Sequence, residues 1–317
     1  MTIQIGGVIK FDFLICVVGP TAVGKTVHSI KLARSIETEI ISADSRQFYK
    51  ELEIGTAKPN SQELAAVKHH LINSLSIYDH YDVRKFENDA LRILAHIFSE
   101  MKVAIMVGGS GLFVDAVCYG LDDLPPVSSE LRDQLTQELA TKGLDSLVDE
   151  LMESDPDYCI QADLKNPQRV IRALEVIRST GKSFSSFRTG KKVARPFHVI
   201  MIGLEMAREK LYERIDLRMD QMIENGLFEE AERFYGKRQL NALQTVGYKE
   251  IFGYLDGDYD RDEAIRLLKR NSRRYAKRQM TWFKKNDQVK WFESSDHEGV
   301  LKYVLSEIES KSLEAEK

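Results

Sequence analysis

The sequence predicts an α/β protein in which a mostly parallel β-sheet is flanked by helices and an all-helical lobe is inserted into the chain. Short apolar runs rich in β-formers, separated by helical periodicity, indicate the sheet. They lie at 13–18, 39–43, 103–107 and 197–204. Between 121 and 195 only helical patterns occur. We therefore expect a core domain from 1–120 and 196–317, and a lobe from 121–195.

Composition and length set the class of protein. The 317 residues are enough for a large domain with an inserted module, and 43% hydrophobic with 30% charged residues is typical of globular proteins. No apolar run approaches the roughly 20 residues of a membrane helix, and no secretory signal is visible. Cys16, Cys118 and Cys159 lie far apart, which favours neither disulfides nor zinc. We expect a cytoplasmic protein without a membrane partner.

The segment after the first predicted strand fits G-x-x-x-x-G-K-[ST], the P-loop pattern. Between a strand and a helix, such a loop presents backbone N–H groups and a positive helix end to an anion. Its lysine adds a charge, and its hydroxyl can bind Mg²⁺. The pattern predicts a P-loop NTPase-like core with a bound diphosphate or triphosphate; the alternative is a glycine turn without a ligand. The residues are Gly19, Pro20, Thr21, Ala22, Val23, Gly24, Lys25 and Thr26.

Two other predicted strands end in polar or glycine-rich loops. Asp44 follows the strand 39–43, and the carboxyl ends of parallel strands share one edge, so we expect it beside the P-loop. An aspartate there can also serve as a turn or helix cap. After 103–107 comes Gly108-Gly109-Ser110-Gly111, where many P-loop NTPases have an acidic Mg²⁺ ligand. The glycines indicate close approach of the backbone to another group, or a turn without a ligand.

The adjacent histidines His69 and His70 raise the possibility of a metal site. Neighbouring residues on a strand point to opposite faces of a sheet. We therefore interpret both as ordinary polar or partly buried side chains.

Helix signals recur through the lobe and beyond it. Ser128 is expected to cap a helix that ends near Thr141, and Asn166-Pro167 to open one that ends at Gly181. A helix over 208–225 places Arg214 and Arg218 on one face, where Asp216 and Asp220 could pair with them. The tail after Val300 is expected to be a polar helix or disorder.

A long predicted helix over 260–285 has an unusual charge pattern. Between 266 and 285 it carries nine basic residues and no acidic one, in a chain of net charge −4. Nine uncompensated charges predict an extended polyanion such as an RNA backbone as partner; a solvated charged face is the alternative. The basic residues are Arg266, Lys269, Arg270, Arg273, Arg274, Lys277, Arg278, Lys284 and Lys285.

In combination, these motifs resemble those of bacterial tRNA dimethylallyltransferases, also called tRNA isopentenylpyrophosphate transferases. The P-loop is shared with many families, whereas Asp44-Ser45 and the segment Lys277–Trp282 are far more specific. The similarity covers nearly the whole chain, in the family's order. The matching segments are 19–26, 44–49, 54–59, 107–110, 166–169, 172–176, 246–248 and 276–282.

The resemblance implies that the P-loop binds dimethylallyl diphosphate rather than ATP, and that the product is an N6-prenylated adenine next to the tRNA anticodon. It assigns Asp44 as the general base, which suits a poorly nucleophilic N6 amine. Lys25, Arg218 and a Mg²⁺ ion bound by Thr26 would stabilise the leaving diphosphate. Ser110 would contact the tRNA or the bridging oxygen. The expected partners are dimethylallyl diphosphate and a tRNA anticodon stem-loop, bound by a monomer.

The resemblance also implies which residues contact tRNA. Arg46 stands where methionine is commoner in the family, and Gln244 where a relative can carry arginine. Both departures affect contacts to bases and leave the chemistry intact. The expected tRNA-contacting residues, together with three of the basic helix, are Asp44, Ser45, Arg46, Gln47, Ser110, Arg132, Gln168, Arg169, Val170, Ile171, Arg172, Gln244, Thr245, Val246, Gly247, Tyr248, Lys249, Arg274, Lys277 and Arg278.

Two other functions fit part of the sequence. A P-loop small-molecule kinase would use ATP as donor, with Arg169 and Arg172 in a lid. The glycine turn at 108–109 and the basic helix disfavour it, because a small substrate requires no such helix. A nucleotide-dependent RNA-binding switch is the non-enzymatic alternative. The sequence contains no Asn-Lys-x-Asp guanine motif, which disfavours a GTPase switch.

Overall fold

The computed structural model describes residue 9 and residues 11–314, which form two compact units. One contains the described residues up to Tyr119 and from Arg195 onward, and the other is Gly120–Ala194. These limits lie one residue from the boundaries expected at 121 and 195. Within the described residues of either unit, no helix is long and apolar enough to cross a membrane.

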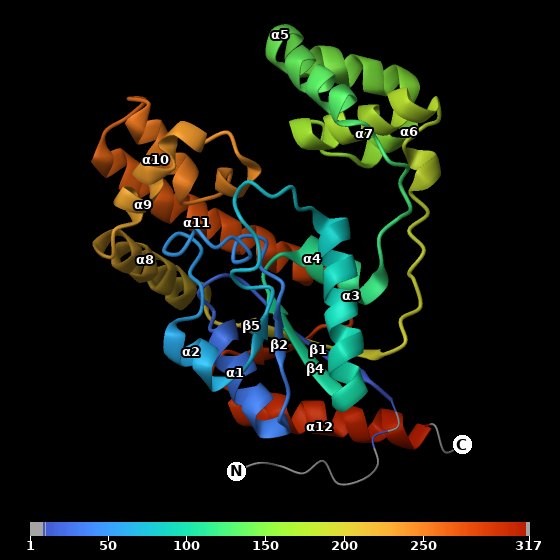
Figure 1. The fold of residues 1–317 in the computed structure, drawn as a ribbon, viewed down its shortest axis with the longest axis vertical. Coiled ribbons are helices and arrows are strands. Elements are labelled where there is room, and N and C mark those ends of the chain that lie inside the picture. Colours follow the sequence, from blue (N-terminus) through green and yellow to red (C-terminus); the bar gives the residue numbers. More distant parts are fainter. Residues whose placement is uncertain (1–8, 10, 315–317) are drawn as a thin grey trace. The chain divides into compact units, whose positions relative to one another are not determined.

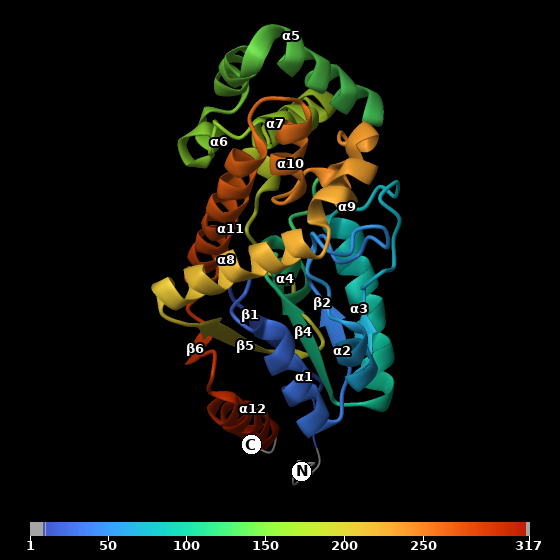
Figure 2. The same cartoon turned by 90° about the vertical axis from the view of Figure 1, so that its left-hand side faces the viewer.

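The first unit is built on a six-stranded parallel sheet in the order β3-β2-β4-β1-β5-β6 (Figures 1 and 2). This confirms the predicted α/β fold. β3 and β6 lie at the two edges and were not predicted, because strands of two and four residues are too short to show a period, and Lys-Trp-Phe-Glu does not alternate. The strands are β1 (Phe13–Val18), β2 (Ile40–Ser42), β3 (His69–His70), β4 (Val103–Gly108), β5 (His198–Glu205) and β6 (Lys290–Glu293).

Helices cover both faces of this sheet because side chains alternate along its strands. Phe13, Ile15 and Val17 of β1 pack in one apolar cluster with α1, α8 and α12. Leu14 and Cys16 point to the other face and pack with α3 and α4. The helices are α1 (Lys25–Ile36), α2 (Ser61–Ala66), α3 (Val83–Glu100), α4 (Gly111–Tyr119), α8 (Arg208–Glu224), α9 (Leu227–Arg233), α10 (Tyr248–Leu255), α11 (Arg261–Phe283) and α12 (His297–Glu314), with 3₁₀ turns η2 (Tyr235–Lys237) and η3 (Asn241–Leu243).

Local sequence explains where the long helices begin. The carboxylates of Asp82 and Asp260 accept backbone N–H groups three residues later, which caps α3 and α11. α12 settles the two alternatives for the tail in favour of a helix. The tail is less polar than expected, because Val300, Val304 and Ile308 are buried in the core.

The second unit is a helical lobe with its own apolar core. Ser128 caps its first helix as predicted, but that helix continues past Thr141 to Ser154. Gly143, with φ of 82°, kinks it, so the predicted end corresponds to an interruption. The elements are α5 (Ser129–Ser154), α6 (Pro156–Gln161), α7 (Pro167–Thr180) and the 3₁₀ turn η1 (Ser185–Phe187).

A buried carboxylate anchors the loop at 53–55 in the first unit. Glu230 of α9 is 1% exposed, and it accepts the backbone N–H groups of Glu53, Ile54 and Gly55 at 2.9–3.0 Å. It also accepts the hydroxyl of Tyr248 at 2.6 Å. Negative charge on this carboxylate and burial together raise the pKa of Tyr248, burial being the larger cause.

Replacing Glu230 by Ala should lower the free energy of unfolding by about 3 kcal/mol, because three backbone N–H groups lose their buried acceptor. Tyr248→Phe, which removes one donor from the same carboxylate, should cost about 1 kcal/mol. Urea denaturation of both variants measures the difference. Equal losses would show that the carboxylate is not the anchor.

Candidate active site

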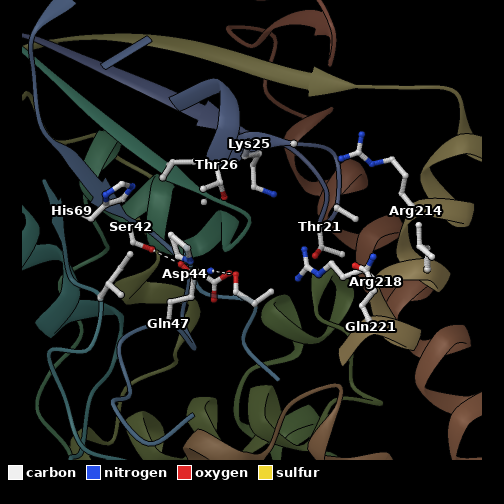
Figure 3. Close-up of a pocket in the computed structure, with 18 residues that line it drawn as sticks. Thr21, Lys25, Thr26, Ser42, Asp44, Gln47, His69, Arg214, Arg218 and Gln221 are labelled. Carbon is white, nitrogen blue, oxygen red and sulfur yellow. Dashed lines mark hydrogen bonds between the residues drawn. The ribbon is translucent and has the colours of Figure 1, made fainter. Parts of the chain in front are cut away.

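A cavity of about 480 Å³ opens at the carboxyl edge of the sheet (Figure 3). The loops after β1, β2 and β4 and one face of α8 form its walls. Figure 3 shows polar side chains from these separate elements pointing into one space. The labelled residues that line it are Thr21, Lys25, Thr26, Ser42, Asp44, Gln47, His69, Arg214, Arg218 and Gln221.

The loop at 19–26 enters α1 through backbone with positive φ. Gly24 precedes α1 with φ of 109°, and Ala22 also has positive φ, at 63°. A residue with a side chain rarely adopts such a backbone conformation, so glycine is needed where the loop enters the helix. Gly24 and Lys25 line the cavity, and the N-terminal end of α1 therefore faces it.

Lys25 lies folded back over its own loop. Its Nζ donates to the carbonyl oxygens of Gly19 at 3.0 Å and Pro20 at 2.7 Å. Burial of the ammonium lowers the pKa of Lys25 to about 7; the nearby carboxylate of Asp44 opposes this, and the cation of Arg218 adds to it. An anion bound in the cavity would favour the charged ammonium and raise the pKa of Lys25 again.

Arg218 and Arg214 extend from one face of α8 into the same cavity, as their spacing predicted. Burial is the main cause of a lowered pKa of Arg218. Its Nε is buried and has no hydrogen-bond partner among the described residues. A buried, unpaired guanidinium N–H costs free energy unless an acceptor binds it. The arrangement therefore indicates an anionic ligand.

Asp44 stands between this cavity and a smaller one of about 80 Å³, and it lines both. Its Oδ1 accepts the backbone N–H of Arg46 at 3.0 Å, which fixes the carboxylate without neutralising it. The smaller cavity has apolar walls from Ile215, Met219 and Met222. Arg218 lines both cavities as well, so a carboxylate and a guanidinium lie where the two cavities adjoin.

Ser110, at the end of β4, holds the loop that carries Asp44. Its Oγ accepts the backbone N–H of Ser45 at 3.1 Å and lies 3.3 Å from the Ser45 hydroxyl. Tyr275 of α11 lies close by, and burial together with the negative charge of Asp44 raises the pKa of its hydroxyl to about 12. Tyr275 was not expected in the site.

In two stretches predicted to contact tRNA, 44–47 and 244–249, some side chains are exposed or line a cavity and others are engaged within the chain. The amide of Gln47 binds Ser42, Thr56 and Ala57, so it is engaged within the chain. Thr245, Val246 and Gly247 line the smaller cavity, and Gln244 and Lys249 are exposed. The side chain of Tyr248 is fully buried and bound to Glu230, so it is not exposed for the expected tRNA contact.

In the lobe too, some of the residues predicted to contact tRNA are exposed and others are buried. Val170 and Ile171 are buried in its core, so their side chains are not exposed for the expected tRNA contact. Gln168 and Arg169 are exposed at the start of α7. Arg132 and Arg172 lie together, because both pair with the buried carboxylate of Glu175, at 3.1 and 2.9 Å.

The positive charge of the basic helix α11 is partly compensated by acidic residues of α8, β5 and the first turn of α11 itself, which corrects the expectation of nine unpaired charges. Asp216 and Asp220 pair with Arg273 and Lys269, and not with the arginines of their own helix. Arg266 pairs with Glu263, and Lys284 with Glu205. The residues left exposed, without an ion pair to any residue that the structure describes, include Arg274, Lys277 and Arg278.

His69 is a cavity residue that the sequence interpretation missed. Its Nδ1 lies 2.8 Å from the carbonyl oxygen of Val67, while its buried Nε2 has no partner among the described residues. His70 points elsewhere, with its Nε2 2.6 Å from Glu39. The two-residue strand β3 placed His69 at the edge, and so short a strand leaves no sequence signal.

No cluster of three or more histidine, cysteine, aspartate or glutamate side chains suited to a metal occurs in the described part of the chain. The Thr26 side chain lines the cavity beside Lys25. Magnesium in phosphate sites is held by one or two protein groups, with phosphate oxygens and water completing its shell. The donor set present fits that mode of binding.

A family model and the sequences of known proteins both relate this chain to IPP transferases. A model of the IPP transferase family matches residues 47–286. A tRNA dimethylallyltransferase of Christiangramia forsetii is 52% identical, over 94% of this chain and 99% of its own length. One from Bacteroides fragilis, tRNA dimethylallyltransferase 1, is 47% identical over 93% and 98%.

Solved structures agree with these relatives. The full-length tRNA isopentenylpyrophosphate transferase of Bacillus halodurans is 38% identical, with a TM-score of 0.72 over 96% of this chain and 100% of that one. A eukaryotic dimethylallyltransferase, solved acting on tRNA, is 26% identical with a TM-score of 0.75; the match covers 90% of this chain and 74% of that one.

The lowered pKa of Lys25 predicts a pH effect on stability. The unfolded chain keeps a lysine pKa near 10.5, so between about pH 7 and 10.5 it holds a proton that the ligand-free native chain lacks. Stability rises with pH wherever the unfolded state binds more protons. The free energy of unfolding of the wild type should therefore rise relative to Lys25→Met over this range.

Urea denaturation from pH 6 to 10 measures this difference, and the subtraction removes every other titrating group. Well below pH 7 the difference should be constant, because both states are then protonated at Lys25. A difference that stays constant up to pH 10 would contradict the lowered pKa.

Proposed function

The chain belongs to the IPP transferase family, and from that premise we propose that it transfers a dimethylallyl group from dimethylallyl diphosphate to N6 of the adenine 3′-adjacent to the anticodon of tRNAs. The observation that carries this proposal is the position of Asp44. Its carboxylate lines both the cationic cavity at the P-loop and the smaller cavity, in which Ile215, Met219 and Met222 form part of the wall. Such a group can reach a nucleophile as it meets a carbon attached to a bound diphosphate.

Asp44 acts as the general base in this reaction. The lone pair of N6 is delocalised into the purine ring, so the amine attacks well only as a proton leaves it. N6 forms a bond to C1 of the dimethylallyl group, the bond from C1 to the diphosphate oxygen breaks, and the N6 proton passes to Asp44. The backbone N–H of Arg46 orients the carboxylate for this transfer.

Negative charge grows on the bridging oxygen as diphosphate leaves. The P-loop N–H groups, Lys25 and Arg218 stabilise that charge, and the unpaired Nε of Arg218 supplies a donor without first breaking another bond. Mg²⁺, bound through the Thr26 hydroxyl and the diphosphate, would neutralise charge on the leaving group. Ser110 keeps the Asp44 loop in place through Ser45.

The tRNA partner explains the exposed cations of α11. Arg274, Lys277 and Arg278 would bind phosphates of the anticodon stem-loop, while the adenine is flipped out of its stack to reach Asp44. Gln168, Arg169 and the Arg132–Arg172 pair of the lobe would add contacts to the RNA. We expect a monomer that works in the cytoplasm, where its tRNA substrates are found.

Transfer of label tests the proposed function directly. The full chain is incubated with unmodified tRNA, Mg²⁺ and dimethylallyl diphosphate labelled in its allylic carbons. The RNA should become labelled at the adenine beside the anticodon. Label taken instead from the γ-phosphate of ATP, by RNA or by a small molecule, would favour a kinase and contradict the proposal.

Asp44→Asn should lower the single-turnover rate of transfer by at least a thousandfold, since the amide keeps the shape of the side chain but cannot accept the proton. The affinity for tRNA, measured by filter binding, should stay within threefold. Asp12→Asn is the matched control, because Asp12 precedes β1 at the opposite edge of the sheet and pairs with Lys102. A rate for Asp44→Asn within tenfold of wild type would remove the base from the mechanism.

Replacing Arg274 and Arg278 together by Ala should weaken tRNA binding and reduce its dependence on salt. Each lost phosphate contact lowers the slope of log K against log salt by about one, so the pair should lower it by about two. Arg266→Ala, on the same helix but paired with Glu263, should leave the slope unchanged. An unchanged slope in the double variant would mean that this face is only solvated.

A further inference from the structure

Gln279 of α11 links two loops of the site and has no role in the steps described above. It is 5% exposed and lies on the inner side of the helix that carries the exposed cations. Its Oε1 accepts the backbone N–H of Thr21 in the P-loop at 2.8 Å. Its Nε2 donates to the carbonyl oxygen of Gly109, after β4, at 3.0 Å. One side-chain amide therefore joins the P-loop to the neighbouring glycine turn.

The two loops that Gln279 joins determine the geometry of the reaction. Thr21 lines both cavities, so a shift of its backbone changes the cradle for the diphosphate. Gly109 precedes Ser110, whose hydroxyl holds the N–H of Ser45 next to Asp44. Displacement of the Gln279 amide would therefore alter the distance between the diphosphate cradle and the general base.

Gly109 is shaped for this contact. A Cβ at residue 109 would lie 2.1 Å from the Nε2 of Gln279, much closer than two such atoms approach. The absence of a side chain at 109 thus allows the amide to reach the carbonyl oxygen. Since Gln279 is buried, an amide without these partners would leave polar groups unsatisfied. The N–H of Thr21 needs an acceptor and the carbonyl oxygen of Gly109 needs a donor, so the amide of Gln279 satisfies both in one orientation only.

Neighbours on α11 reinforce the same side of the helix. Tyr275 lies one turn before Gln279, beside Asp44 and Ser110. Trp282 lies about one turn after it, and its Nε1 donates to Asp115 at 2.8 Å. The inner face of α11 therefore contacts the loops after β1 and β4 and lies beside the loop after β2, while the outer face carries Arg274, Lys277 and Arg278.

We propose that Gln279 is a positioning residue that holds the P-loop and the β4 turn at the separation that dimethylallyl diphosphate requires. The proposal rests on the function given above, because it assigns the P-loop to that substrate. Loss of the amide should affect the diphosphate far more than the tRNA, since the Gln279 side chain is turned away from the exposed face of α11. A purely structural role would instead reduce the amount of active protein without changing either KM.

Steady-state kinetics of the full chain test this split. Gln279→Met, which keeps the volume but removes both hydrogen bonds, should raise KM for dimethylallyl diphosphate at least tenfold and change KM for tRNA less than threefold. Gln288→Ala is the matched control, because that exposed glutamine, just beyond α11, accepts a hydrogen bond from Tyr119 far along the chain from the P-loop. Unchanged KM values, or equal increases in both, would overturn the proposal.

Gly109→Ala is a second variant that leaves Gln279 in place. Its methyl group should push the amide away and raise KM for dimethylallyl diphosphate as well. Because both changes act on one contact, the double variant Gly109→Ala, Gln279→Met should be no worse than the more affected single variant. Effects that multiply in the double variant would contradict a shared cause.

Calorimetric binding of inorganic pyrophosphate with Mg²⁺ separates this inference from the proposed function. Gln279→Met should bind pyrophosphate at least tenfold more weakly than wild type, whether or not the chain transfers a prenyl group. Equal affinities would overturn the role of Gln279. Wild-type binding of pyrophosphate without any transfer of label to tRNA would instead count against the proposed function alone.

Discussion

Excess positive charge at one edge of the sheet is the constraint on which the site depends. Lys25 and Arg218 face a single carboxylate, Asp44, inside a cavity of about 480 Å³. Burial opposes both cations, and the Nε of Arg218 has no partner within the described chain. Such an arrangement is costly without an anion, and a diphosphate supplies the charge and the acceptors that it lacks. In the proposed reaction, the same cations would stabilise the charge that develops when diphosphate leaves.

The parallel sheet brings these groups together. Lys25, Asp44 and Ser110 follow three different strands, whose carboxyl ends meet at one edge. β4 lies between β1 and β2, so the Gly108–Ser110 turn separates the loop at 19–26 from the loop that carries Asp44, the proposed base. Contacts across this edge, from Ser110 to Ser45 and from Gln279 to Thr21 and Gly109, hold the loops in register.

Sequence predicted the features that depend on local pattern. The glycine-rich loop at 19–26, the central strands and the Ser128 cap of α5 were identifiable because glycines, apolar runs and caps act within a few residues. Pairing between residues of distant elements could not be predicted from such local patterns. Asp216 binds Arg273 and not a neighbour on α8, and Tyr248 is buried because Glu230 lies behind it. His69 and Tyr275 reach the site through an edge strand of two residues and a helix more than 200 residues further on.

A crystal structure of the full chain with an unreactive thiolo analogue of dimethylallyl diphosphate and an anticodon stem-loop tests the central claim most directly. The account predicts the diphosphate against Lys25 and Arg218, with N6 of an extruded adenine about 2.6–3.2 Å from a carboxylate oxygen of Asp44. A diphosphate bound elsewhere, or an adenine whose N6 lies away from that carboxylate, would contradict it.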